Sequence, residues 1–114
     1  MPRTDFLKET RIHDFSYNKK NELCCEKVPL RKILEKTGSP AYIYSSKTIL
    51  EHLGKLQRAF RSVRPLICYS VKANANLAIL KTLVRKGAGL DIVSGGELFR
   101  AGKVKCPGRK IVYA

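Results

Sequence analysis

The sequence predicts an α/β fold in which parallel strands alternate with helices. Three apolar stretches have the length and composition of buried strands: residues 65–71 (PLICYSV), 90–94 (LDIVS) and 110–114 (KIVYA). Segments with helical periodicity separate them, and equivalent positions recur at intervals of about 20 residues. Strands that are joined by one helix each run parallel and belong to an α/β sheet or barrel.

The two helices between these strands have recognisable ends. Asn76 can cap the first helix, which ends at one of the glycines that follow it. Ser94 and Glu97 match a capping box that opens the second helix, over residues 97–104 (ELFRAGKV). The apolar residues of the first helix recur at helical spacing: Leu77, Leu80, Leu83 and Val84.

The first part of the chain is less regular. Residues 1–28 form a lead-in segment, in which NELCCEKV (residues 21–28) could be a strand without a visible partner. A short helix is expected from Pro29 to Gly38, followed by a brief strand over residues 41–44 (AYIY).

A longer helix is predicted after this brief strand. Ser45 or Ser46 can cap it, and its apolar residues recur at helical spacing, so one face should be buried. These apolar residues are Ile49, Leu50, Leu53, Leu56 and Phe60.

The composition indicates a folded globular chain. With 114 residues, of which 44% are hydrophobic, it can form one small domain, whereas a (β/α)8 barrel needs about 250 residues. No apolar run reaches the length of a membrane span, and the charged start (MPRTDFLKET) lacks a secretory signal, so we expect a cytoplasmic location. Four cysteines, including the adjacent Cys24 and Cys25, fit neither a disulfide framework nor a zinc site, which predicts free thiols.

The charge balance leaves a second class of function open. The chain has 23 basic and 9 acidic residues, and a net charge of +14 would suit a nucleic-acid binder. The basic residues are scattered singly, however, without a basic helix face or a motif that stacks on RNA bases. After Glu51 only two acids remain, Asp91 and Glu97, and both lie in DIVSGGE.

A lysine stands at the carboxyl end of the first parallel strand. Alternate side chains of a strand share a face, and we expect the bulkier set to meet the helices and the smaller set to line a barrel interior. Lys72 extends the smaller set to the strand end, where α/β barrels have their active sites, and Asp91 lies near the same level on the next strand. The smaller set is Leu66, Cys68, Ser70 and Lys72, and the bulkier set is Ile67, Tyr69 and Val71.

These positions suit Schiff-base chemistry. Partial burial favours the neutral, nucleophilic form of a lysine amine, which attacks an aldehyde such as that of pyridoxal phosphate. Each residue also has a purely structural interpretation. Lys72 can begin a loop and extend into solvent, Asp91 can pair with a nearby Lys or Arg, and Glu97 can serve only the helix start.

Four segments resemble the pyridoxal-phosphate decarboxylases that have an alanine-racemase-like barrel. The resemblance is closest to the diaminopimelate decarboxylases, and it covers roughly residues 18–114 with agreement in order and spacing. The segments are GSPAYIYS (residues 38–45), YSVKANAN (69–76), GAGLDIVSGGEL (87–98) and CPGRKIVYA (106–114).

The resemblance implies a fold and an assembly. Residues 29–114 would be the amino-terminal part of a pyridoxal-phosphate-binding (β/α)8 TIM barrel, and residues 1–28 would supply a strand to a separate β domain. We therefore expect the chain to be an incomplete part of a larger protein that forms a homodimer. Alone it should be inactive, because the groups that stack on the cofactor ring and bind its phosphate lie beyond it.

The resemblance also implies an activity, the decarboxylation of meso-diaminopimelate to L-lysine and CO₂ in lysine biosynthesis. Lys72 would be the catalytic lysine that forms the Schiff base with pyridoxal phosphate. Asp91 would order the site around the cofactor, and Glu97 would be a second acid behind it, with no metal ion. An alanine racemase fits less well, because Asn74 is followed by Ala-Asn-Leu, and ornithine or arginine decarboxylases remain the closer alternative.

Overall fold

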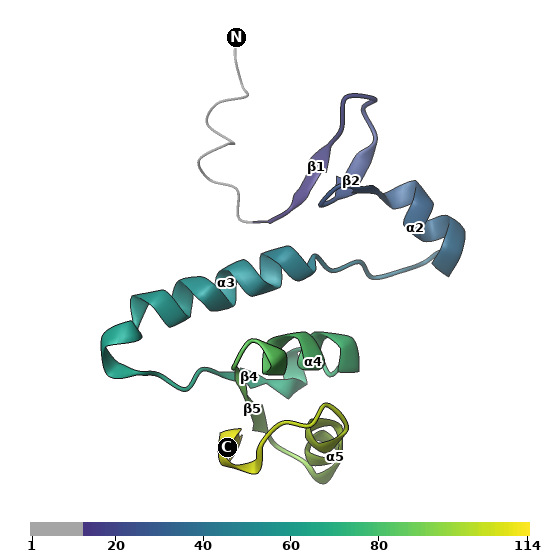
Figure 1. The fold of residues 1–114 in the computed structure, drawn as a ribbon. Coiled ribbons are helices and arrows are strands. Elements are labelled where there is room, and N and C mark those ends of the chain that lie inside the picture. Colours follow the sequence, from purple (N-terminus) through teal and green to yellow (C-terminus); the bar gives the residue numbers. More distant parts are fainter. Residues whose placement is uncertain (1–12) are drawn as a thin grey trace. The chain divides into compact units, whose positions relative to one another are not determined.

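The structure, a computed structural model, describes residues 13–114, so the first 12 residues of the predicted lead-in segment lie outside it. The chain divides into two compact units, one that ends at Thr48 and one from Ile49 to Ala114 (Figure 1). The expected domain boundary at residue 28 stays a prediction.

The first unit contains a small antiparallel sheet of order β1-β2-β3. Its strands are β1 (Phe15–Tyr17), β2 (Leu23–Cys25) and β3 (Val28–Pro29), and the helix α2 (Leu30–Thr37) follows directly. The strand predicted in residues 21–28 is therefore a hairpin, because the chain turns at Glu26 with a φ of 58°. Its missing partner is β1, which is too short to give a periodic signal.

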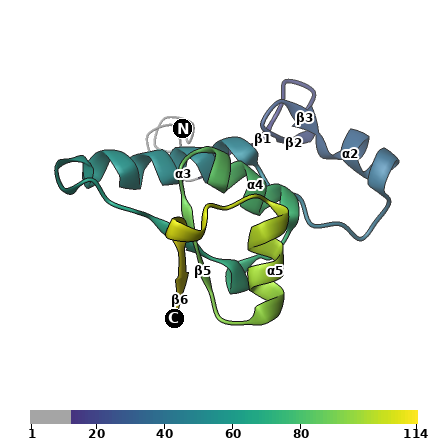
Figure 2. The same ribbon diagram turned by 60° about the horizontal axis from the view of Figure 1, so that its bottom comes forward.

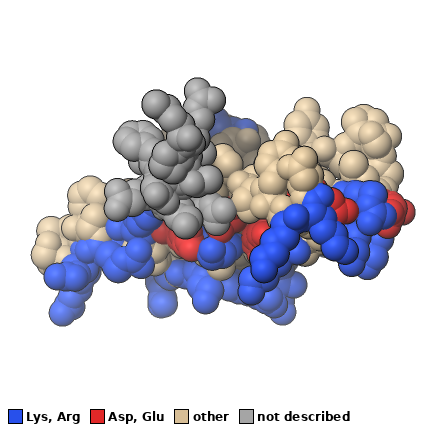
Figure 3. Space-filling view, turned by 90° about the horizontal axis from the view of Figure 1, so that it is seen from above, with Lys and Arg blue, Asp and Glu red and all other residues tan. Residues whose placement is uncertain are grey.

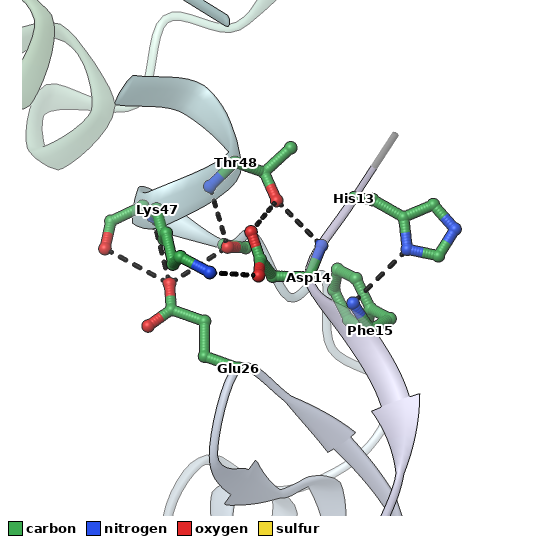
Figure 4. A network of polar contacts seen from close by, with 8 residues as sticks. His13, Asp14, Phe15, Glu26, Lys47 and Thr48 are labelled. Carbon is green, nitrogen blue, oxygen red and sulfur yellow. Dashed lines mark hydrogen bonds and ion pairs between the residues drawn. The ribbon is translucent and has the colours of Figure 1, made fainter. Parts of the chain in front are cut away.

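A polar network joins this sheet to the start of the next helix, α3 (Ser46–Ala59) (Figure 4). Buried Asp14 accepts hydrogen bonds from Lys47 Nζ at 2.7 Å and from Thr48 Oγ1 at 3.1 Å. Glu26 Oε1 accepts from Lys47 N at 3.0 Å and from Ser45 Oγ at 2.9 Å. These bonds, with the Lys47 amide as the largest contribution, lower the pKa of Glu26.

The predicted cap of α3 is confirmed at Ser45, whose Oγ accepts a hydrogen bond from Thr48 N at 3.0 Å. The brief strand predicted over residues 41–44 is wrong, because this stretch is irregular and no described strand pairs with it. The buried face of α3 is narrower than predicted. Leu53 is buried, whereas Leu56 and Phe60, which directly follows the last residue of α3, are about half exposed.

The second unit confirms the predicted βαβαβ order. Its sheet has the parallel order β4-β5-β6, with β4 (Cys68–Ser70), β5 (Gly89–Ile92) and β6 (Ile111–Tyr113). The connections contain α4 (Leu77–Arg85) and α5 (Gly95–Lys103), and Figure 2 shows β6 beside β5 with α5 alongside them. Single 3₁₀ turns are η1 (Arg61–Val63), η2 (Val71–Ala73) and η3 (Gly108–Lys110).

Both predicted caps in this unit are found. Asn76 Oδ1 accepts from Ala78 N at 2.9 Å, and Ser94 Oγ accepts from Glu97 N at 3.2 Å. Because Ser94 is itself the N-cap residue, α5 begins at Gly95, two residues earlier than predicted.

The core of this unit lies on one face of the sheet. Leu90 and Ile92 are buried there against α4 and α5, together with Val71. Tyr69 packs on both core clusters and Ile67 on the second, which confirms that the bulkier set of β4 meets the helices. The second cluster consists of Leu53, Ile79, Leu83 and Ala88.

Two further features of the described residues bear on the sequence predictions. All four cysteines are free thiols, as expected. Within residues 13–114, no helix combines the length and the apolar character that crossing a membrane requires.

Candidate active site

Lys72 directly follows β4 at the carboxyl edge of the parallel sheet. It lies in η2, which packs against β5 and is anchored by the fully buried side chain of Val71. The Lys72 side chain is exposed, and its amine forms no hydrogen bond or ion pair with any residue between 13 and 114. The expected partial burial of Lys72 is therefore absent from the described part of the chain, because three strands supply few side chains at this edge.

Asp91 lies opposite Ser70 in the register of β4 and β5. Ser70 Oγ donates a hydrogen bond to Asp91 Oδ2 at 2.8 Å, so the partner that this acid needs is a hydroxyl. The alternative of an ion pair with Lys or Arg is not found among residues 13–114. Asp91 Oδ1 is buried and, within the same residues, has no hydrogen-bond partner.

The side chains around this acid are small. Cys68 and Gly89 lie on the same sheet face as Ser70 and Asp91, because positions two apart on a strand share a face. A Cβ atom on Gly89 would lie 2.8 Å from Cys68 Sγ and in contact with the Lys110 carbonyl oxygen, so only glycine fits there. Burial is the main cause that raises the pKa of the Cys68 thiol, and the charge of Asp91 raises it further.

The loop after Lys72 is held from both neighbouring helices. Asn74 Oδ1 accepts from the amide of Asn76, which caps α4. Arg100 of α5 donates from Nη1 to the carbonyl oxygen of Ala75 at 3.0 Å. No sequence pattern indicated Arg100, because only the packing of α5 distinguishes it from the other scattered basic residues.

Glu97 forms hydrogen bonds at the N-terminus of α5. Its Oε2 accepts a hydrogen bond from Val93 N at 2.7 Å, while its own amide bonds to Ser94. This is the structural interpretation that the sequence left open for Glu97. Within residues 13–114, no hydrogen bond or ion pair joins Glu97 to Lys72 or Asp91.

The arrangement at this edge suits an aldehyde cofactor that is held by an amine. Lys72 provides an amine and Asp91 a buried acceptor atom, and no residue between 13 and 114 engages either one. A buried oxygen that lacks a donor is costly, so Asp91 Oδ1 fits an N–H donor that is in place when the site is assembled. The residues present therefore fit pyridoxal phosphate bound through Lys72.

Comparison with known proteins gives a family. Residues 46–114 match the model of the pyridoxal-dependent decarboxylase, pyridoxal-binding domain. The chain is 49% identical over 78 residues to a diaminopimelate decarboxylase of Neisseria meningitidis, which covers 68% of the chain and 19% of that protein. It is 47% identical over 93 residues to a diaminopimelate decarboxylase of Aquifex aeolicus, or 82% of the chain and 22% of that protein.

Solved structures agree with these relatives. A diaminopimelate decarboxylase from M. jannaschii matches 89% of this chain and 24% of its own, with a TM-score of 0.82 at 31% identity. One from Helicobacter pylori, complexed with L-lysine, matches 74% of this chain and 21% of its own, with a TM-score of 0.69 at 34% identity.

The chain thus spans about a fifth to a quarter of the length of the relatives that it matches. The expected fold class, an α/β pyridoxal-phosphate barrel represented by its first strands and helices, is confirmed. With a family model that matches from the start of α3 to Ala114, this chain belongs to the pyridoxal-dependent decarboxylases, through their pyridoxal-binding domain.

Proposed function

We propose that this chain is the lysine-bearing part of a pyridoxal-phosphate enzyme that decarboxylates meso-diaminopimelate to L-lysine and CO₂. The observation that carries the proposal is the exposed amine of Lys72 at the carboxyl end of β4, which no residue between 13 and 114 engages and whose turn packs against the strand of Asp91. The curated relatives named diaminopimelate decarboxylase support this substrate over ornithine or arginine. The H. pylori relative is complexed with L-lysine, which is the product expected here.

Each site residue would have a distinct role. Lys72 would hold the aldehyde carbon of pyridoxal phosphate through its amine until an amino-acid substrate takes its place. When bound, the cofactor supplies an electron sink for the pair of electrons that remains as CO₂ leaves. Asp91 would order the site by accepting a hydrogen bond at Oδ1, and Glu97 would be the second acid behind it, at the start of α5.

The loop from Lys72 to Asn76 would keep the amine at the sheet edge during this exchange. The Arg100 bond to the Ala75 carbonyl oxygen and the cap at Asn76 restrict the backbone that carries the lysine. A restricted backbone lowers the entropy that Lys72 loses when it enters the reactive geometry. We propose a homodimer for the full-length protein, as the family resemblance implies.

The test uses the full-length protein that contains this chain. Wild type should show a visible absorbance band of bound cofactor that borohydride reduces, and it should release CO₂ from meso-diaminopimelate in preference to ornithine and arginine. Lys72→Ala should lose both. Lys81→Ala is the matched control, because Lys81 is an exposed lysine on α4 outside the site. A folded wild type without the band in excess cofactor would refute the proposal.

Nucleic-acid binding is the second candidate function, and the charge favours it. Lys and Arg are abundant on the face that Figure 3 shows, where Asp and Glu are few. In the first unit, a hollow of about 500 Å³ is lined by Lys19, Lys20, Lys27, Arg31 and Lys32, with Asn18, Glu22 and Pro29. Binding of this kind would weaken steeply with added salt, and a filter-binding titration at two salt concentrations tests it.

A further inference from the structure

The hydrogen bond between Ser70 and Asp91 determines the positions of both carboxylate oxygens of Asp91. It joins the last residue of β4 to the third residue of β5, on the sheet face opposite the core. A carboxylate rotates about a broad sp³–sp² torsion, so its two oxygens are easily exchanged. Because Ser70 engages Oδ2, the same bond determines where Oδ1 lies.

Nothing on the described strands competes for Asp91 Oδ1. Cys68 is the titratable side chain on the same face of β4, and its thiol is a weak donor. The β6 neighbour in register is Val112, which has no polar atom in its side chain. An acceptor that is buried, held in place and without a donor among residues 13–114 is suited to a donor that engages it in the assembled site.

Lys72 is an amine-bearing residue whose backbone lies close to this pair in the fold. The turn η2, which carries Lys72, starts directly after Ser70 and packs against β5. When the cofactor is bound, a carboxylate oxygen beside the Lys72 nitrogen would favour its protonated form. If the Asp91 side chain rotated freely, its carboxylate would stabilise the protonated Lys72 nitrogen less.

Building on the function proposed above, we propose that Ser70 is a positioning residue for the decarboxylase. Its hydroxyl holds Asp91 Oδ2 so that Oδ1 accepts a hydrogen bond from the Lys72 nitrogen when the cofactor is bound, and thereby keeps that nitrogen protonated. Ser70 itself does not touch the cofactor. It acts through the orientation and the charge of Asp91.

The experiment uses the full-length protein with Ser70→Ala, Ser70→Thr and the control Cys68→Ala. Cys68 lies on the same strand face but makes no hydrogen bond to Asp91, so its truncation changes packing and leaves the Ser70 hydroxyl in place. The readouts are the pH titration of the cofactor absorbance, kcat and KM for meso-diaminopimelate. They separate a positioning role from a role in folding alone.

We expect Ser70→Ala to keep cofactor that borohydride reduces, while the pH of the absorbance change falls below that of wild type. The kcat should drop roughly ten-fold with KM little changed, because a hydrogen bond to a charged group is lost. Ser70→Thr should restore both values, and Cys68→Ala should titrate as wild type does. An unchanged titration in Ser70→Ala, or an equal shift in Cys68→Ala, would overturn the proposal.

A double-mutant cycle covers the case in which Ser70→Ala folds poorly. Asp91→Asn removes the charge and should lower the same spectroscopic pH. When Asp91→Asn is already present, Ser70→Thr or Ser70→Ala should add no further shift, because Ser70 acts through Asp91. Additive shifts would contradict the proposal. Loss of the cofactor band in wild type would instead refute the proposed function, so the two failures are distinguishable.

Discussion

Single residues determine how closely the parallel strands approach one another. Gly89 lets β5 approach the Cys68 thiol and the Lys110 carbonyl oxygen closely. A Cβ atom at this position would overlap both groups, so no larger residue fits. Ser70 and Asp91, one level higher, form the polar pair that lies next to the turn of Lys72. Small side chains on one strand face thus leave room for a polar group at the carboxyl edge.

The variant Gly89→Ala should lower the free energy of unfolding by about 1–3 kcal/mol, because its Cβ would overlap backbone and sulfur atoms. Urea denaturation of the full-length protein measures this loss. Gly102→Ala is the matched control, since a Cβ on Gly102 meets no atom within 4 Å in α5. It should be neutral or stabilise by up to about 1 kcal/mol. Equal stability of the two variants would contradict the close approach.

The Cys68 thiol reports on the charge of Asp91 without any cofactor. Burial and then Asp91 raise the pKa of Cys68, so Asp91→Asn should lower it and speed alkylation at neutral pH. The rate of iodoacetamide labelling against pH, read for each cysteine by mass spectrometry, measures the change. Cys24 serves as the internal reference, and an unchanged Cys68 profile would show that Asp91 is not charged beside it.

At the scale of elements, the sequence predicted the helices and their caps well and the strands less well. The sequence identified α2, α4 and their ends, because proline, asparagine and glycine act within a few residues of the chain. It placed a strand over residues 41–44 that does not form, and it missed β1 as the partner of β2. Strand formation depends on a neighbour that is remote in sequence, which local patterns do not reveal.

The network at the start of α3 should make the first unit sensitive to acid. The lowered pKa of Glu26 adds stability at a pH above the pKa of this carboxyl in the unfolded chain, and this stability is lost as the pH falls through the lower pKa of the folded chain. Glu26→Gln should therefore be less stable than wild type at neutral pH, with the difference vanishing in acid. Thermal unfolding followed by circular dichroism at several pH values measures it.

Glu35→Gln is the control for this prediction. Glu35 pairs with Arg31 at 2.6 Å on the exposed surface of α2, where such pairs contribute little. The variant Glu35→Gln should lower the free energy of unfolding by less than about 0.5 kcal/mol at neutral pH. A loss as large as that of Glu26→Gln would indicate a general charge effect and contradict the role of the network.

On the scale of the whole molecule, much apolar surface remains uncovered. Tyr113 is 75% exposed and Phe99 65%, and the described sheet has free edges at β4 and β6. Open strand edges and apolar surface of this kind favour pairing with other chains. The family assignment gives a reason, since the relatives are between three and four times as long as this chain.

We therefore expect the 114-residue chain, produced alone, to self-associate at micromolar concentration despite its charge of +14. Sedimentation velocity over a concentration series measures the association. Val112→Lys, which adds a charge to the β6 edge strand, should reduce it, whereas Lys81→Ala on α4 should not. A monomer at all concentrations would contradict the prediction and support an independent basic module.

The sequence by itself determined the alternation of strands and helices and the caps at Ser45, Asn76 and Ser94, because these depend on local patterns. It also predicted Lys72 and Asp91 as site residues, from their positions at the strand ends and from a family motif. Only the tertiary structure decided that Ser70 bonds Asp91, that Arg100 holds the loop after Lys72, and that Glu97 bonds the amide of Val93. The first two contacts join segments that are more than 20 residues apart. They form only when parallel strands and their helices pack, and no local pattern encodes that packing.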